Sequence, residues 1–94
     1  MELDVLQGLM RSLYGDRDAS RGIDATFRWF TEEVGELARA IRKGDGDDLK
    51  HEFGDVLAWL ASIANLLDVD LEAAATRYSH GCPRCGQIPC ECPL

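Results

Sequence analysis

Apolar residues recur at intervals of three and four through the first 78 residues, which is the periodicity of amphipathic helices. Turns rich in glycine and aspartate separate these periodic segments. The sequence contains neither the alternating pattern of a half-buried strand nor an internal repeat. The pattern therefore predicts an all-α fold, a bundle of about four helices built on a helical hairpin.

The boundaries of the first two helices follow from stop and cap signals. We expect the first helix over residues 3–14, ended near Gly15, and a polar loop over 15–23. Asp24 is a suitable cap for the second helix. That helix is expected to end at residues 42–44, where two cations precede a glycine.

The second half of the chain contains two further helices and a tail. Residues 45–48 supply a turn and acidic caps for a long third helix, whose apolar face runs over 49–67. Asp70 is the expected cap of a short fourth helix that reaches about Tyr78. We therefore predict a helical domain at 1–78 and a cysteine-rich, zinc-binding tail in the remaining residues, 79–94.

Composition narrows the possible partners and the location. The net charge of -7 argues against a nucleic-acid polymer or an anionic membrane as partner. No apolar run approaches the roughly 20 residues that cross a bilayer, and the acidic N-terminus does not resemble a signal peptide, so a cytoplasmic protein is expected. One short hairpin cannot cover the apolar face from Val56 to Leu67, so we also expect a homodimer or homotetramer.

Two pairs of carboxylates are the main candidates for chemistry. Glu33 and Glu36 lie three residues apart in the second helix, and Glu52 and Asp55 repeat this spacing in the third. Each pair therefore projects from one face of its helix. At about 1.5 Å per residue both pairs lie at a similar depth from the turn, so all four side chains are expected to converge.

Converging carboxylates repel one another unless a cation neutralises them. Hard oxygen ligands in this number suit Mg²⁺ or Mn²⁺, which also bind phosphate oxygens. Gly35 and Gly54 lie beside these acids, at positions where a missing side chain lets two helices approach closely. The alternative is a solvated acidic face without a metal.

The acidic pattern resembles that of a known family. Glu32-Glu33-x-x-Glu36 followed by Glu52-x-x-Asp55 is similar to the signature of the MazG-like, all-α nucleotide pyrophosphohydrolases. The resemblance covers about residues 1–78 and implies Mg²⁺-dependent cleavage of a nucleoside triphosphate to a monophosphate and pyrophosphate. It implies metal ligation by Glu33, Glu36, Glu52 and Asp55, and a supporting or water-orienting role for Glu32.

Other residues are weaker candidates for holding the nucleotide. Trp29 and Trp59 lie on the acidic faces of their helices and could each stack on a base, or simply pack in an interface. We expect them at opposite ends of the acidic patch, so that at most one lies near a given base. The resemblance favours Arg77 as a phosphate partner, and Asn65 is a similar candidate. His51 is interpreted as a surface residue.

Four cysteines fall within eleven residues at the C-terminus. Cys82-x-x-Cys85-Gly86 is typical of a zinc knuckle, and Cys90-x-Cys92 supplies two further thiolates. A closed, tetrahedral, structural zinc site is predicted, with His80 as a possible substitute ligand. Disulfides or unmetallated thiols are the alternatives.

Two rival functions fit the same residues. The phosphoribosyl-ATP pyrophosphohydrolases share the acidic motif and would act on a different substrate. A non-catalytic helical dimerisation module, with a structural cation and a zinc tail for docking, is the second rival. Pyrophosphate release that depends on a divalent metal distinguishes an enzyme from this module.

Overall fold

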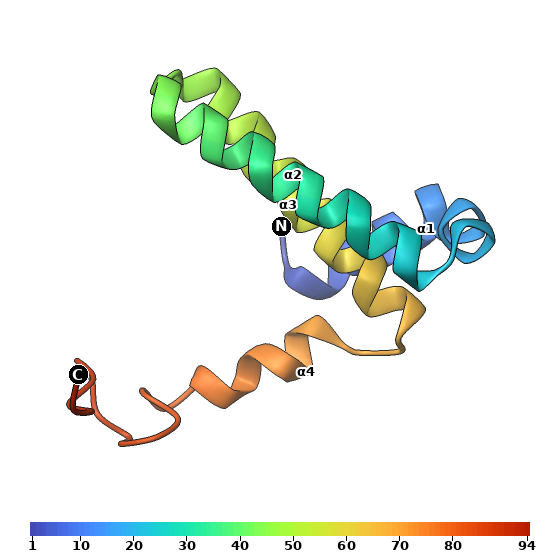
Figure 1. The fold of residues 1–94 in the computed structure, drawn as a ribbon. Coiled ribbons are helices and arrows are strands. Elements are labelled where there is room, and N and C mark those ends of the chain that lie inside the picture. The colour runs from blue at the N-terminus through green and yellow to red at the C-terminus, as the bar shows by residue number, and fades with distance from the viewer.

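The computed structural model describes all 94 residues and confirms the all-α prediction, with no strand. α2 and α3 lie side by side as a long hairpin, and α1 packs on α3 at the end away from the turn (Figure 1). The tail and α4 extend away from this body (Figure 1). The helical elements are α1 (Leu3–Arg21), α2 (Ile23–Lys43), α3 (Gly46–Leu66), α4 (Leu71–Ala75) and the 3₁₀ helix η1 (Thr76–Tyr78).

The first helix is longer than its sequence suggests. The predicted stop at Gly15 and the loop over 15–23 are wrong, because α1 continues to Arg21 and a single residue, Gly22, joins it to α2. One interior glycine costs about 1 kcal/mol in a helix, which packing against α3 can offset. Gly22 has φ 88° and ψ 166°, a region open essentially only to glycine, and this conformation is what separates the two helices.

The turn between α2 and α3 follows its predicted signals. Gly44 adopts the left-handed conformation, and its N–H donates to the Ala40 carbonyl oxygen at 2.9 Å. The Asp45 carboxylate accepts hydrogen bonds from the backbone N–H groups of Asp47 and Asp48. These contacts satisfy helix ends that otherwise lack partners, so the chain reverses over the two residues between α2 and α3.

A buried glutamine fastens α1 to the segment before α4. The Gln7 amide nitrogen donates to the Val69 carbonyl oxygen at 2.7 Å, and its oxygen accepts from the Leu71 N–H at 2.9 Å. The Asp70 carboxylate accepts from the Ala73 N–H, which confirms the predicted cap of α4. Helical structure then continues through η1 to Tyr78, the predicted limit.

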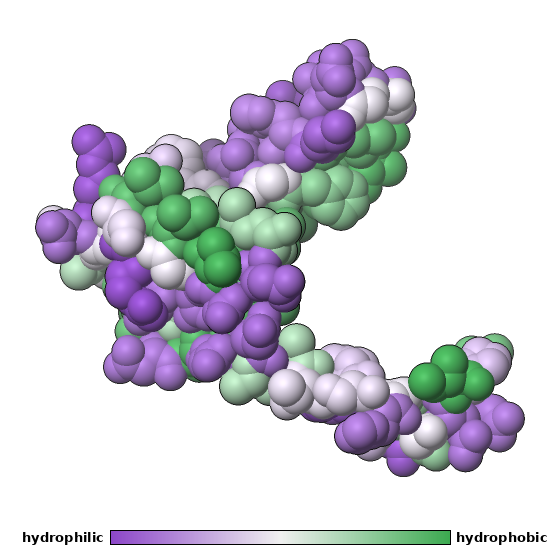
Figure 2. All heavy atoms as spheres, turned by 180° about the vertical axis from the view of Figure 1, so that it is seen from behind, coloured by the Kyte–Doolittle hydropathy of each residue, from purple (hydrophilic) through white to green (hydrophobic).

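The chain buries little of its apolar surface. Only nine of the 94 residues are buried, and Ala61, Ile63 and Ala64 of α3 form the centre of the core. Apolar side chains instead gather on the outside of the hairpin arm, seen as green atoms in Figure 2. No helix combines the length and the apolar character that crossing a membrane requires.

Two glycines of the hairpin do not bring its helices together. A Cβ added at Gly35 or Gly54 would meet no other atom within 4 Å. The expectation that these glycines permit a close approach of α2 and α3 is therefore wrong within one chain. Both positions lie on the exposed surface of the arm.

Candidate active site

The hairpin brings the predicted carboxylates together. Ligand oxygens of Glu33 and Glu36 on α2 and of Glu52 on α3 lie within 4.8 Å of one another. Glu52 also belongs to a second cluster of this kind, with Asp55 and His51, so Glu52 links Asp55 to the other two acids. The spacing of three within each helix, and the similar distance of both pairs from Gly44, produce this convergence.

No lysine or arginine of the chain forms an ion pair with the carboxylates of this cluster. Partial burial, and then the negative charges of its neighbours, led by Glu36, raise the pKa of Glu33 above its ordinary value. The Oε2 atoms of Glu33 and of Glu52 are both buried, and neither has a hydrogen-bond partner. Buried acceptors of this kind require a donor or a cation. Glu33, Glu36 and Glu52 offer only carboxylate oxygens, and ligands of this kind fit a hard divalent cation.

His51 is a surface residue that also contacts one of the predicted metal ligands. Its Nε2 lies 3.2 Å from Asp55 Oδ2, one helical turn along α3. The imidazole is well exposed, with 69% of its side-chain surface accessible, whereas the Asp55 side chain is 40% accessible. The contact orients one of the predicted ligands. The four-residue spacing was the sequence signal for it.

The two tryptophans are neighbours, and the expectation that they lie at opposite ends of the patch is wrong. Their ring centroids are 6.1 Å apart and their planes differ by 15°, an offset stack. Trp29 precedes the turn by about as many residues as Trp59 follows it, so an antiparallel hairpin places them at the same depth. The Arg21 guanidinium lies over the Trp59 ring, 4.9 Å from its centroid.

Two of the weaker candidates lie away from the carboxylates. The Asn65 amide oxygen accepts from Arg11 at 2.8 Å, and its nitrogen donates to the Gln7 carbonyl at 3.1 Å, so this side chain ties α3 to α1. Arg77 lies in η1 with its guanidinium over the Tyr78 ring. Glu32 is closer, because it lines a shallow hollow with Trp29 on α2.

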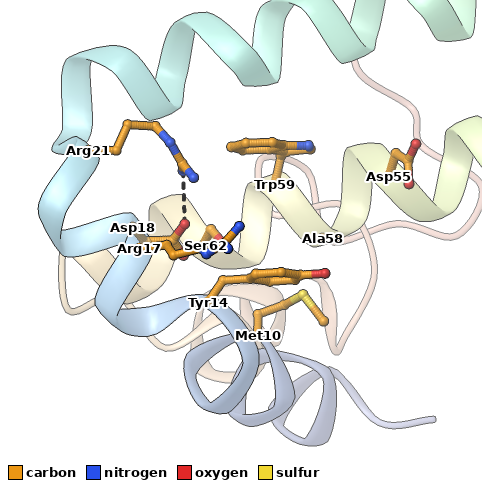
Figure 3. Close-up of a pocket in the computed structure, with 9 residues that line it drawn as sticks. All are labelled: Met10, Tyr14, Arg17, Asp18, Arg21, Asp55, Ala58, Trp59 and Ser62. Atoms are coloured by element: carbon orange, nitrogen blue, oxygen red, sulfur yellow. Dashed lines mark hydrogen bonds and ion pairs between the residues drawn. The ribbon is translucent and has the colours of Figure 1, made fainter.

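A pocket beside the acidic cluster involves residues that the sequence did not single out. Its volume is about 270 Å³, and it lies between α1 and α3 with Asp55 at one end (Figure 3). The residue pattern does not predict this pocket, because several lining residues belong to the last turns of α1, where the pattern indicates a loop. The lining residues are Met10, Tyr14, Arg17, Asp18, Arg21, Asp55, Ala58, Trp59 and Ser62.

Comparison with known protein families matches residues 21–84 to the MazG nucleotide pyrophosphohydrolase domain. This range covers more than half of the chain and contains all four clustered carboxylates. The chain belongs to the MazG nucleotide pyrophosphohydrolase family. The match ends between Cys82 and Cys85, so most of the cysteine tail lies outside the MazG domain.

Individual relatives of this MazG-family chain are similar over part of their length. An uncharacterized protein of Bacillus subtilis (strain 168), YpjD, is 43% identical over 60 residues, which cover 53% of this chain and 54% of the relative. The gene 37 protein of Mycobacterium phage L5 is 35% identical over 74 residues, covering 67% of this chain and 65% of the relative. The chain thus spans between half and two thirds of the length of these relatives.

The cysteine tail of this MazG-family chain forms a second cluster of possible metal ligands. All four Sγ atoms lie within 4.8 Å of one another, and Cys82 Sγ is 3.6 Å from Cys90 Sγ and 3.7 Å from Cys92 Sγ. These separations are close to the edge of about 3.8 Å in a tetrahedron with bonds of about 2.3 Å, the length of a zinc–thiolate bond. The cysteines are unbridged. The arrangement therefore fits one tetrahedral soft-metal site.

Backbone groups of the knuckle already favour thiolates. The N–H groups of Cys85 and Arg84 lower the pKa of Cys82 to about 6. Backbone N–H groups, led by that of Glu91, also lower the pKa of Cys85. Hydrogen bonds with the neighbouring cysteine side chains, led by Cys90, raise the pKa of Cys92 to about 11, because they hold the proton on its sulfur. A metal ion at the centre of the four sulfurs displaces the remaining thiol protons, because thiolates are the ligand form.

Proposed function

We propose that this chain is a nucleoside triphosphate pyrophosphohydrolase that requires Mg²⁺ or Mn²⁺ and converts a ribo- or deoxyribonucleoside triphosphate to its monophosphate and pyrophosphate. Membership of the MazG family supports the reaction class. The observation that carries the proposal is that Glu33 and Glu52, on the two helices of the hairpin, each have a buried, unpartnered oxygen and belong to one cluster of ligand atoms within 4.8 Å of one another. A metal bound there satisfies both.

The acidic residues of α2 and α3 have different proposed roles, according to where they lie. Glu33, Glu36, Glu52 and Asp55 hold the cation, and His51 fixes the orientation of Asp55. When bound, the cation neutralises charge on the phosphate oxygens and activates the attacking water. Glu32, one residue from this set on α2, is proposed to orient that water. Catalysis then depends mainly on positioning and electrostatic stabilisation.

We propose a structural role for the tail. Cys82, Cys85, Cys90 and Cys92 hold one zinc ion, because soft thiolates select Zn²⁺ over the hard cations preferred by carboxylates. Four thiolates leave no open coordination position, so the tail takes no part in hydrolysis. His80 is not needed as a ligand when all four sulfurs converge.

We also propose that the active form is a homodimer. Exposed apolar residues recur every seven positions on α2, at Phe27, Val34 and Ile41, and on α3 at Phe53 and Leu60. A repeat of seven is the pattern of helices that pack along a seam. At about 100° per residue, Val34 lies roughly 100° around α2 from Glu33 and 160° from Glu36, so the apolar stripe and the acidic pair occupy different faces of the helix.

The test is a panel of nucleoside triphosphates assayed for pyrophosphate release with Mg²⁺, and with EDTA. We expect release with Mg²⁺ and none with EDTA. Asp55→Asn removes one ligand charge and should lower kcat/KM by about 10²-fold or more. Asp48→Asn, a change of the same chemistry in the exposed first turn of α3, should leave kcat/KM unchanged. Phosphoribosyl-ATP in the same panel distinguishes the rival enzyme, which acts on that substrate. Absence of pyrophosphate release from every substrate would refute the proposal.

A further inference from the structure

The pocket beside the carboxylate cluster has the form of a slot with two aromatic walls. Trp59 of α3 and Tyr14 of α1 lie on opposite sides of it, and Figure 3 shows both rings nearly edge-on and parallel. Trp59 is held in place by its stack on Trp29 and by the Arg21 guanidinium. A flat aromatic ligand between two such walls gains stacking on both faces.

The two ends of the slot differ in what they offer. Asp55, at one end, belongs to the acidic cluster, and Asp18 lies toward the other end (Figure 3). A nucleotide whose base fills the slot therefore extends its phosphates past Asp55, toward the proposed cation. The volume of about 270 Å³ leaves room for one base and its immediate surroundings.

Asp18 is a buried charge with one unused acceptor. Its exposed fraction is 2%, and one carboxylate oxygen accepts from Arg21 Nη1 at 2.9 Å. The other oxygen, Oδ2, is buried and has no hydrogen-bond partner. An unpaired buried acceptor is costly, so a ligand that brings a donor to it gains more than an ordinary hydrogen bond. Arg21 keeps the first oxygen occupied and so fixes which one remains.

We propose that this slot binds the base of the substrate and that Asp18 is the specificity-determining residue, accepting a hydrogen bond from an exocyclic amino group. The slot then favours cytosine and adenine over uracil and hypoxanthine, which carry a carbonyl oxygen at the equivalent position. Two acceptors cannot pair, so the carbonyl leaves Oδ2 unsatisfied. This proposal rests on the proposed nucleotide hydrolysis and names its base preference.

Tyr14 and Asp18 lie outside the part of the chain that matches the MazG domain, which begins at residue 21. They reach the slot because α1 continues beyond Gly15 instead of ending there. The base preference is therefore a property of this first helix and of how it packs on α3.

The experiment uses two matched pairs of substrates, CTP with UTP and ATP with ITP, in which an amino group replaces a carbonyl. For the wild-type protein with saturating Mg²⁺, kcat/KM for pyrophosphate release should favour the amino member of each pair by about 10- to 100-fold. Asp18→Asn retains an oxygen for Arg21 and puts an amide donor in place of Oδ2, so the preference should fall to unity or invert. Asp16→Asn, an exposed acid on the same helix, should keep the wild-type ratio.

Circular dichroism shows whether Asp18→Asn folds. If it does not fold, a second variant still tests the slot. Tyr14→Leu removes one wall of the slot and should raise KM for all four nucleotides by about tenfold, with the amino-to-carbonyl ratio unchanged. Equal hydrolysis of both members of each pair by the wild-type protein would overturn the proposal while leaving the proposed reaction intact. So would an unchanged KM in Tyr14→Leu.

Failure of the proposed reaction is distinguished by a binding measurement. CMP and UMP are titrated without metal while tryptophan fluorescence is followed, which requires no turnover. Tighter binding of CMP in a protein that hydrolyses nothing would support the slot and refute the reaction. Equal binding, or no quenching by either nucleotide, would refute the slot directly.

Discussion

Glu33 is the carboxylate of the acidic cluster whose pKa is raised, first by partial burial and then by the negative charges of its neighbours. Its raised pKa means that the folded chain binds this proton more tightly than the unfolded chain does. Stability without metal therefore falls as pH rises through the interval between the ordinary and the raised pKa. At neutral pH the Glu33 charge destabilises the metal-free fold, and a bound cation removes that penalty.

Neutralising Glu33 should therefore separate stability from activity. In EDTA, Glu33→Gln should melt about 1–4 °C above the wild-type protein, because a partly buried charge and its like-charge contacts, together worth a few tenths of a kcal/mol, are lost. Added Mg²⁺ should raise the melting temperature of the wild-type protein and not that of the variant. Differential scanning fluorimetry measures both, with the exposed Glu2→Gln as control. A variant that melts lower in EDTA and still responds to Mg²⁺ would contradict the assigned role.

The sequence predicted some site residues better than others. The convergence of Glu33 with Glu52 required only helix periodicity and a turn, both visible in the residue pattern. The Trp29–Trp59 stack follows from the same counting, because the two residues lie equally far from Gly44 on the two helices of the hairpin. The sequence does not reveal Asp18 as a site residue, because its burial depends on how the last turns of α1 pack, and the residue pattern favours a loop there.

At the scale of elements, glycines at positions 15 and 22 have opposite roles. Gly15 lies inside α1, where a Cβ would meet only Arg11 Cγ at 3.6 Å. Gly22 has φ +88°, a conformation that L residues rarely adopt. Sequence alone does not distinguish them, because the helix boundary is decided by the contacts of α1 with α3.

The same substitution should consequently have opposite effects at the two positions. Gly15→Ala should stabilise the chain by about 0.5–1 kcal/mol through helix propensity. Gly22→Ala should destabilise it by about 1–3 kcal/mol through backbone strain. Urea unfolding followed by circular dichroism gives both values. Destabilisation by Gly15→Ala would mean that α1 ends near residue 14, as the sequence pattern had indicated.

The cysteine tail should behave as a separate element with its own metal. Purified protein should contain about one zinc per chain by elemental analysis. Cys82→Ser/Cys85→Ser should lose that zinc and still release pyrophosphate at a measurable rate, because the carboxylates lie on the hairpin. Ser79→Ala, in the same segment, should keep both properties. A folded double variant without any hydrolysis would place the tail in the active site.

For the molecule as a whole, the accessible surface is larger than a compact monomer needs. The chain exposes 7047 Å², whereas a compact monomer of 10.4 kDa is expected to expose about 5,400 Å². The radius of gyration of 15.6 Å also exceeds the roughly 12.4 Å expected for 94 residues. The difference in area, about 1,650 Å² for one chain, is about twice the roughly 800 Å² that each partner buries in a standard protein interface. The free hairpin arm and the projecting tail account for this openness (Figures 1 and 2).

Pairing of two hairpin arms covers the seven-residue stripe and predicts a defined oligomer. Sedimentation velocity at micromolar concentration should show a dimer, and the melting temperature should rise with protein concentration. Phe53→Glu introduces a charge into the stripe at a position 54% exposed in the single chain, and should yield a monomer with a lower melting temperature. Leu13→Glu is a matched change at an exposed position of α1, away from the arm, and should remain dimeric. A monomeric wild-type protein, or a dimer that withstands Phe53→Glu and dissociates with Leu13→Glu, would show that the arm is not the interface.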